Sequence, residues 1–164
     1  MTVWTPDDAA ELRAILDVDD AYLRPWIPFM KDEPRSLDAT RDWLVDLAAQ
    51  FDAGENFRYA LRRKVGGELV GENMLLTRPG PGALEVGYWI ASAFTGRGFA
   101  TESTEALLEV ARRLEGIERV VLQCDVRNAP SNAIPRKLGA KVESQVHVDD
   151  SDGPADLDVW VMNV

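Results

Sequence analysis

The sequence predicts an α+β fold: one domain over residues 1–164, in which helices flank a mixed, mostly antiparallel sheet. Three observations support this prediction. The length of 164 residues is typical of one domain. A hydrophobic content of 46% is enough to bury a core. Helical patterns come first, turn-linked strands follow, and a further helix then lies between two strands, which is the order expected of a mixed sheet.

Two helices are expected in the first third of the chain. Apolar residues at helical spacing predict a short helix at about residues 7–17. A second pattern begins at Ser36, with Asp38 in its first turn and Gly54 just past its end. Between these helices, prolines interrupt both periodicities over residues 22–29. This segment is therefore expected to be a loop with exposed aromatic side chains.

Three strands are expected next, over residues 57–64, 68–76 and 84–90. The glycines of residues 65–67 are a hairpin signal between the first two strands. Alternating Pro and Gly at residues 79–82 indicate a second turn. Short turns between strands predict that the three strands form an antiparallel meander.

The clearest amphipathic helix begins near Gly98 and ends before Gly116, because small and apolar residues recur there at helical spacing. An apolar strand is expected at residues 118–125. The strand, the helix and the next strand should form one unit with a right-handed crossover.

A short helix and two strands are expected to complete the chain. The helix is expected near residues 131–138, and Pro135 is tolerated in it only if it begins at about Ser131 or Asn132. The strands are expected at residues 141–148 and 157–164, joined by a hairpin turn over Ser151, Asp152, Gly153 and Pro154.

Charge and composition exclude several classes of protein. The 28 acidic residues outnumber the 18 basic residues, for a net charge of -10, which argues against nonspecific nucleic-acid binding and against a polybasic membrane anchor. No apolar run approaches the roughly 20 residues of a membrane-spanning helix, and the first residues do not resemble a secretory signal. With one cysteine, an internal disulfide is impossible. We therefore expect a soluble cytoplasmic protein.

Several catalytic motifs are missing from the sequence, among them the Walker, zinc-protease and nucleophile-elbow patterns. The only histidine, His147, lies in a strand pattern, and Cys124 lies in an apolar strand. Both are expected to be structural residues. One His and one Cys among scattered carboxylates do not predict a metal site.

The most informative segment is a glycine turn, which we define as residues 95–101, between a strand and the long helix. The first N–H groups of a helix lack partners within the helix, and the helix dipole adds positive character there. Missing side chains at Gly96, Gly98 and Ala100 would let a ligand reach those groups. Further contacts are available from Thr95, Arg97 and Thr101. The segment is expected to bind a pyrophosphate, and the alternative is that its small residues serve only packing.

The surrounding residues resemble a known family. The blocks Gly87-Tyr88-Trp89-Ile90 and Gly96-Arg97-Gly98-Phe99-Ala100-Thr101-Glu102 resemble the acyl-CoA motif of the GNAT N-acetyltransferases. The blocks Asn128-Ala129-Pro130-Ser131-Asn132, Lys137-Leu138-Gly139 and Arg24-Pro25-Trp26-Ile27 are similar to the branch that includes the ribosomal-protein N-terminal acetyltransferases. These blocks span most of the chain.

This resemblance implies a GNAT-like fold with a splayed central strand pair, and acetyl-CoA as co-substrate with no metal. The implied cofactor-binding residues are Tyr88, Trp89, Ile90, Thr95, Gly96, Arg97, Gly98, Phe99, Ala100, Thr101, Asn128, Ser131 and Lys137. The amides of the glycine turn would hold the pyrophosphate. Residues 88–90 would pair with pantetheine and polarise the thioester carbonyl, Asn128 would bond pantetheine, and Ser131 would donate to the departing thiolate. Thr95 departs from the Gln or Arg usual at its position, and Ala140 departs from the usual aromatic residue.

The resemblance also implies direct transfer of an acetyl group to a primary amine. The implied catalytic residues are Ser131 and Glu85, with Glu85 as the general base. The alternative for Glu85 is a surface carboxylate at a strand end. Glu72 is the second candidate base and Tyr88 a fallback acid.

The acceptor is expected beside Trp26, Phe29 and Glu85, although the two aromatic residues could instead cover the core. A protein or peptide N-terminal amine is the favoured acceptor. The alternatives are a small-molecule acetyltransferase acting on an aminoglycoside or polyamine, an acyl-CoA-binding regulatory module without turnover, and an interaction domain. The chain is expected to be a monomer or homodimer, with neither nucleic acid nor membrane as a partner.

Overall fold

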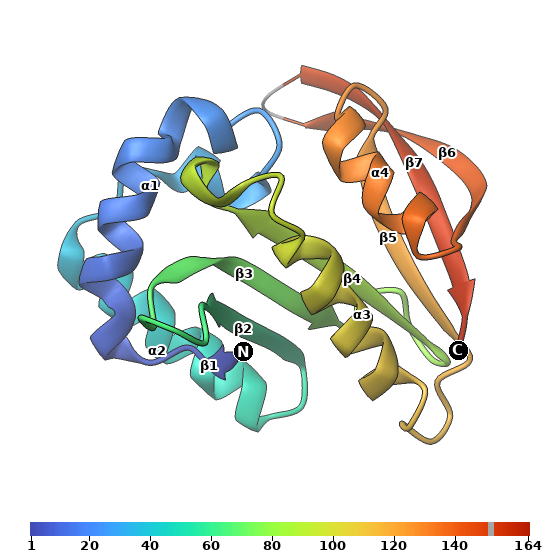
Figure 1. Cartoon of the computed structure of the whole chain (residues 1–164), viewed down its shortest axis with the longest axis horizontal. Helices are drawn as coiled ribbons and strands as arrows, with labels where there is room; N and C mark the ends of the chain where they lie inside the picture. Colours follow the sequence, from blue (N-terminus) through green and yellow to red (C-terminus); the bar gives the residue numbers. More distant parts are fainter. Residues whose placement is uncertain (151–152) are drawn as a thin grey trace. The chain divides into compact units, whose positions relative to one another are not determined.

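A computed structural model describes residues 1–150 and 153–164 of the chain. The described residues form two compact units (Figure 1). The first unit comprises Met1–Met74 and Tyr88–Phe99, and the second comprises Leu75–Gly87 and Ala100–Val164. Two strands contribute residues to both units. The organisation of residues 1–164 as a single domain remains a prediction.

The described residues contain a seven-stranded sheet, which confirms the α+β class and the mixed sheet. Its strand order is β1-β2-β3-β4-β5-β7-β6. The strand bounds are β1 Thr2–Val3, β2 Asn56–Arg62, β3 Leu69–Leu76, β4 Ala83–Ile90, β5 Arg119–Asp125, β6 Lys141–Asp150 and β7 Gly153–Asn163. The pairs β1–β2, β5–β7 and β6–β7 are antiparallel. The two-residue strand β1 was not expected from the sequence.

The parallel pair β4–β5 corresponds to the central strand pair that was expected to be splayed. Its register covers three residue pairs, from Ala83 opposite Arg119 to Glu85 opposite Val121. Both strands continue beyond this register, β4 to Ile90 and β5 to Asp125. The short register agrees with the expected splayed pair, and the helix between the two strands is the expected crossover element.

In the first unit, both helices that the apolar patterns predict are present, although the first is longer than expected. Helix α1 spans Ala9–Leu23 after a 3-10 turn, η1, at Pro6–Asp8. It extends beyond residue 17 because the buried face continues to Leu23. Helix α2 spans Leu37–Asp52, and the Ser36 side chain caps it by accepting a hydrogen bond from the Ala39 N–H at 3.1 Å.

The segment over residues 22–29 differs from the expected exposed loop. A 3-10 helix, η2, spans Pro28–Asp32, and Arg24 fastens it by donating from Nη1 to the carbonyl of Met30 at 2.7 Å. Trp26 and Phe29 are half-buried, and the Phe29 ring lies 5.1 Å from the ring of Trp43. The correction has a physical cause, because the aromatic side chains gain more from packing than from exposure.

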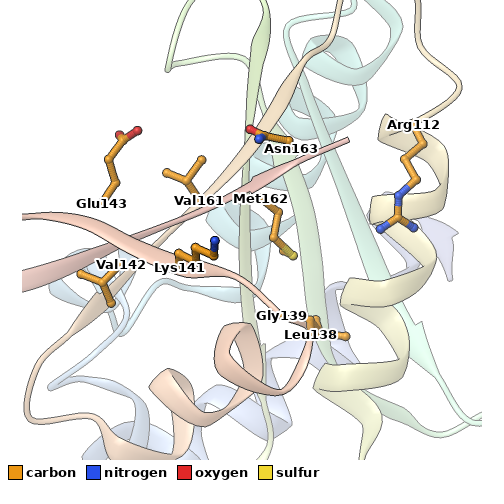
Figure 2. Close-up of a pocket in the computed structure, with 9 residues that line it drawn as sticks. All are labelled: Arg112, Leu138, Gly139, Lys141, Val142, Glu143, Val161, Met162 and Asn163. Carbon is orange, nitrogen blue, oxygen red and sulfur yellow. The ribbon is translucent and has the colours of Figure 1, made fainter.

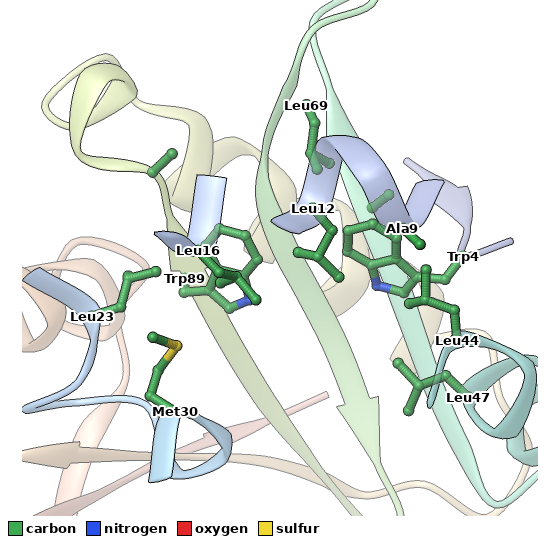
Figure 3. Close-up of a cluster of buried hydrophobic side chains, with 12 residues drawn as sticks. Trp4, Ala9, Leu12, Leu16, Leu23, Met30, Leu44, Leu47, Leu69 and Trp89 are labelled. Atoms are coloured by element: carbon green, nitrogen blue, oxygen red, sulfur yellow. The ribbon is translucent and has the colours of Figure 1, made fainter. Parts of the chain in front are cut away.

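The core of the first unit joins α1, α2, η2 and strands β2–β4 (Figure 3). The leucines of α1 lie beside the two buried indoles, Trp4 and Trp89, with Leu44 and Leu47 of α2 in the same cluster. Full burial of one leucine stabilises a fold by roughly 1.5–3 kcal/mol. The unit therefore provides a rigid support for the part of β4 that it contains.

Helix α3 spans Phe99–Ala111, close to the expected limits, and all of it after Phe99 belongs to the second unit. Its buried residues, Ser103, Thr104, Leu107, Leu108 and Ala111, follow the 3.6-residue period. Helix α4 spans Ala129–Lys137, two residues earlier than expected, so Pro135 lies inside it. The earlier start follows from the cap at Asn128, whose side chain accepts from the Ser131 N–H at 3.2 Å.

The C-terminal hairpin is antiparallel, as expected, but both strands are longer. The register pairs Lys141 with Val161 and extends to Asp150 opposite Gly153, with an irregularity between Val142 and Ser144. Ser151 and Asp152 of the expected turn lie outside the described residues. Among the helices of residues 1–150 and 153–164, none combines the length and apolarity needed to cross a bilayer.

Candidate functional site

The glycine turn is an exposed bend that leads directly into α3. Gly96 and Gly98 have φ values of 70° and 86°, a backbone conformation that residues with a Cβ avoid. No heavy atom lies within 4 Å of the position that a Cβ would take at either glycine. The space over both glycines is therefore open, as an anion approaching the first amides of α3 requires.

A buried carboxylate fixes the start of this turn. Asp19 of α1 accepts hydrogen bonds from the Ser92 N–H at 2.7 Å and from the Ser92 hydroxyl at 2.5 Å. Ser92 begins the short 3-10 helix η3 (Ser92–Phe94), and the rings of Phe94 and Phe99 meet edge to face at 6.3 Å. Residues 95–98 of the glycine turn are exposed, and they lie between the anchored Ser92 and the Phe99 ring that meets Phe94.

The polar side chains of the turn fold back on η3. Thr95 donates its hydroxyl to the Ser92 carbonyl at 3.0 Å. Arg97 donates from Nη2 to the Ala93 carbonyl at 2.9 Å, and its guanidinium lies 5.4 Å from the centre of the Phe94 ring. Both residues are exposed. Arg97 is the positive side chain nearest in sequence to the open glycines, while Ala100 and Thr101 are half-buried in the first turn of α3.

The 88–90 segment of β4 is held against β3. Trp89 is buried, whereas Tyr88 and Ile90 are half-buried, which is the alternation of a strand whose faces differ. A Cβ on Gly71 of β3 would lie 2.1 Å from the Trp89 carbonyl oxygen, so the two backbones approach as closely as glycine permits. The Ala91 N–H donates to the Val70 carbonyl at 2.9 Å.

Glu72, the second candidate base, is a buried hydrogen-bond acceptor. Its Oε1 accepts from Trp4 Nε1 and Arg58 Nε, both at 2.8 Å. Its Oε2 accepts from Arg58 Nη2 at 2.6 Å and from Trp89 Nε1 at 3.0 Å. Four donors therefore surround a carboxylate that is 1% exposed. These contacts occupy the roughly four acceptor positions that a carboxylate offers.

Glu85, the first candidate base, is also buried and paired. Arg78 donates to both of its oxygens, from Nε to Oε2 at 2.6 Å and from Nη2 to Oε1. This hydrogen bonding, with the nearby negative charge, raises the pKa of Arg78. Glu85 is 3% exposed, whereas the Arg78 side chain is 61% exposed. The pair therefore lies at the boundary between the interior and the surface.

The N-terminus of α4 carries Asn128 and Ser131, which are expected to contact pantetheine and the departing sulfur. Asn128 caps the helix, so the N-cap is Asn128 and not Ser131. The Ser131 hydroxyl donates to Sγ of Cys124 on β5 at 3.3 Å. At the end of β5, Arg127 hydrogen bonds lower the pKa of Asp125, and the carbonyl of Asp125 accepts from Asn132 Nδ2 at 2.8 Å. The turn before α4 is therefore firmly anchored.

The other end of α4 is more exposed. Asn132, which is buried near the start of the helix, accepts from the Trp160 indole at 2.8 Å through Oδ1, and near the end the exposed Arg136 places its guanidinium 5.3 Å from the Trp160 ring. Lys137 is exposed in the last turn of the helix, where the dipole favours a cation. Arg136 thus has a packing role, and Lys137 remains available to solvent.

Phe29, one of the expected acceptor residues, belongs to an aromatic cluster of the first unit. The Arg58 guanidinium lies 5.6 Å from the Phe29 ring and 5.4 Å from the Trp43 ring. Phe29 also meets Trp89 at 6.5 Å. Phe29 is thus connected through Arg58 and Trp89 to the same carboxylate, Glu72.

Each unit contains part of the expected site. The first contains Trp26, Phe29, Tyr88, Trp89, Ile90, Thr95, Gly96, Arg97, Gly98 and Phe99. The second contains Glu85, Ala100, Thr101, Asn128, Ser131 and Lys137. Residues that the sequence did not indicate are Trp4, Asp19, Arg58 and Arg78. Their partners are distant in sequence or lie across a turn, so no local pattern marks them.

A further concave surface lies in the second unit, with a volume of about 530 Å³ (Figure 2). Arg112, Lys141 and Glu143 contribute charges to it, and none of the expected site residues lines it. Among the described residues, no group of three or more His, Cys, Asp and Glu side chains is placed to hold a metal ion.

Comparison with known proteins gives three kinds of match. The family model described as acetyltransferase (GNAT) domain matches residues 1–141. The protein YdaF of Bacillus subtilis (strain 168), described as a candidate ribosomal N-acetyltransferase, is 29% identical over 137 residues, which cover 82% of this chain and 73% of YdaF.

Solved structures that share the fold include two acetyltransferases bound to coenzyme A or acetyl-CoA. One is RimL, a ribosomal L7/L12 alpha-N-protein acetyltransferase in complex with coenzyme A, with a TM-score of 0.88 and 20% identity over 99% of this chain and 92% of RimL. The other is the microcin C7 self-immunity acetyltransferase MccE in complex with acetyl-CoA and AMP, with a TM-score of 0.87 and 15% identity over 99% and 90% of the two chains.

Proposed function

The chain belongs to the GNAT acetyltransferase family and is an acetyl-CoA-dependent N-acetyltransferase, and we propose that its acceptor is the N-terminal amine of a protein or peptide. One observation supports the cofactor chemistry on which this proposal depends: Gly96 and Gly98 leave open space at the N-terminus of α3. This is the local geometry that a diphosphate needs at a helix N-terminus. A cytoplasmic location and a monomeric or homodimeric state complete the proposal.

The cofactor-binding residues are assigned as the sequence resemblance implies. The amides of the glycine turn would hold the diphosphate, with Arg97 released from the Ala93 carbonyl to add a charged contact. Backbone groups of the 88–90 segment would pair with the amides of pantetheine, with help from Asn128. Thr95 offers a hydroxyl where the family usually has a longer side chain. Lys137 is assigned to the nucleotide phosphates.

The chain's own groups can support the transfer chemistry. Acetyl-CoA supplies the acetyl thioester. A backbone N–H of the 88–90 segment would polarise the thioester carbonyl. Ser131 would redirect its hydroxyl from Cys124 to the departing sulfur. Glu85 would accept the proton of the amine once Arg78 releases one of its oxygens.

Two arguments favour a peptide N-terminus over other amines, and a third favours a cationic acceptor of any kind. YdaF is described as a candidate ribosomal N-acetyltransferase. An α-amino group has an ordinary pKa of about 7.7–8.0, so a large share is neutral near neutral pH, whereas lysine titrates near about 10.4. An α-amine therefore suits a site whose candidate base is already paired. The net charge of -10 also attracts a cationic acceptor.

The test measures thiol release from acetyl-CoA at pH 7.5 with four acceptors. They are a lysine-free peptide with a free N-terminus, the same peptide with a blocked N-terminus and one lysine, an aminoglycoside and a polyamine. We expect turnover with the first peptide to exceed turnover with the second by at least about tenfold, because of the difference in neutral amine. Faster turnover of the blocked peptide or of a small molecule would overturn the assignment of the acceptor.

The ion pair between Arg78 and Glu85 favours one alternative function. Since both oxygens of Glu85 accept from Arg78, the chain could bind acetyl-CoA as a regulatory module and leave the acetyl group in place. Acetyl-CoA binding, measured as a rise in the melting temperature, with no thiol release from any acceptor would favour this alternative.

A further inference from the structure

We propose that Glu72 is a positioning residue of the acetyl-transfer site, which acts by holding Trp89 and with it the 88–90 segment of β4. The inference rests on the proposed function of that segment, which is to pair with pantetheine and polarise the thioester carbonyl. Glu72 touches neither the cofactor nor the acceptor in this account. Its role is to fix the position and orientation of the backbone of the 88–90 segment, which is assigned to contact the cofactor.

The first support is the saturation of the Glu72 carboxylate. The donors come from three distant parts of the first unit: Trp4 precedes η1, Arg58 lies on β2 and Trp89 lies on β4. Arg58 balances the negative charge with two hydrogen bonds, and its side chain is largely buried. A buried carboxylate with this many partners has one stable orientation. Trp89 is therefore held by a group that is itself immobile.

The second support is the close contact of β3 and β4 at the same place. Gly71, the neighbour of Glu72, leaves no room for a Cβ because the Trp89 carbonyl would lie 2.1 Å from it. The Glu72 side chain holds the Trp89 indole at 3.0 Å. Two consecutive residues of β3 therefore fix one residue of β4, by its backbone and by its side chain. The doubly restrained residue, Trp89, is the middle residue of the 88–90 segment, which is assigned to polarise the thioester carbonyl.

The third support is what the reaction requires of this segment. A backbone N–H stabilises a developing oxyanion only when its position is set before the reaction. A small displacement of such a donor lowers the rate of the chemical step more than it lowers ground-state binding. The glycine turn lies outside the Glu72 contacts and is anchored separately by Asp19. Loss of the Glu72–Trp89 contact should therefore lower kcat and largely preserve the affinity for acetyl-CoA.

The chain provides a matched pair of variants for the test. Trp89→Phe and Trp4→Phe each remove one indole N–H from the same carboxylate, and both indoles are buried. Only Trp89 belongs to β4. We expect Trp89→Phe to lower kcat by about tenfold with less than about a threefold change in KM for acetyl-CoA. Trp4→Phe should keep kcat within about twofold of the wild type.

A third variant separates two effects of Trp89: its hydrogen bond to Glu72, which positions the 88–90 segment, and its contribution to the stability of the fold. Trp89→His restores a ring N–H that can reach Glu72 but loses the benzo ring, so it should be less stable than Trp89→Phe. We nevertheless expect it to recover part of the lost kcat. The three variants are assayed well below their melting temperatures, so that a difference in kcat between them does not reflect a difference in the folded fraction.

Two results would overturn the inference. The first is an equal loss of kcat in Trp4→Phe and Trp89→Phe, and the second is a kcat that follows melting temperature across all three variants. Either would reduce Glu72 to a structural role. The wild-type protein in the same assay tests the proposed function: without thiol release from any amine, that function fails and the inference with it. If the wild type is active and the variants have the same kcat as one another, the inference is rejected and the proposed function is retained.

Discussion

Glu85 accepts hydrogen bonds from Arg78 on both carboxylate oxygens, one of them at 2.6 Å between Nε and Oε2. The two residues are seven positions apart: Arg78 lies in the turn between β3 and β4, and Glu85 lies on β4. A general base needs a lone pair free to receive a proton. The pairing therefore makes proton transfer to Glu85 depend on movement of the exposed guanidinium of Arg78.

The pair gives a prediction for catalysis. If Glu85 is the base, Glu85→Gln lowers kcat at pH 7.5 by about 100-fold. The loss should shrink at pH 9, where α-amines with a pKa of about 7.7–8.0 are mostly neutral without a base. Arg78→Met retains the carboxylate and should lower kcat by less than about tenfold. Steady-state rates of thiol release across this pH range provide the measurement.

Two outcomes contradict this assignment. A loss in Glu85→Gln that is the same at pH 7.5 and pH 9 would show that the side chain does not accept the proton. An equal loss in both variants would show that the intact ion pair matters, and not the free carboxylate. Circular dichroism and melting curves check that each variant is folded.

The sequence predicts best those features that are local. The glycine turn, the start of α3 and the apolar strand β5 each depend on residues within one short window. Helix α4 was expected to begin near residue 131 but begins at Ala129, after the Asn128 cap. Asn128 and Ser131 are both residue types that cap helices, and the cap is decided by which side chain meets which N–H.

Features that join distant residues could not be predicted. Glu72 contacts Trp4, Arg58 and Trp89, which are 68, 14 and 17 residues away. Asp19 anchors Ser92 across 73 residues. The sequence marks Glu72 only as a carboxylate in a strand, which is why it was a candidate base. Its four donors become visible only when the strands are aligned.

The glycine turn gives a prediction for cofactor binding. Gly98→Val should abolish the rise in melting temperature that acetyl-CoA causes, because the added side chain fills the open space above the first amides of α3. Gly54→Val is the matched control, since Gly54 also has a positive φ, of 72°, and no atom within 4 Å. Both should lower stability by about 1–2 kcal/mol. Equal melting shifts with acetyl-CoA in the two variants would refute the assignment.

Ser131 gives a prediction for the leaving group. Ser131→Ala should lower kcat by about tenfold and change KM for acetyl-CoA little, because the hydroxyl is needed when the thiolate departs. Cys124→Ala is the control, since it removes the sulfur that accepts the hydroxyl at 3.3 Å but keeps the hydroxyl itself. It should retain kcat within about twofold. Equal decreases in kcat and in acetyl-CoA affinity for Ser131→Ala would reassign Ser131 to cofactor binding.

The contact between Gly71 and Trp89 gives a prediction for stability. Gly71→Ala would place a Cβ 2.1 Å from a backbone oxygen, which cannot move without separating β3 from β4. We expect this variant to lose about 3 kcal/mol or more of unfolding free energy, as overpacking in a closed site does. Gly67→Ala, at an exposed turn with φ of 73° and no atom within 4 Å, should lose only about 1–2 kcal/mol from backbone strain. Urea unfolding curves measure both losses, and a similar loss in the two variants would mean that the strands can separate without cost, so that Gly71 does not hold the 88–90 segment in place.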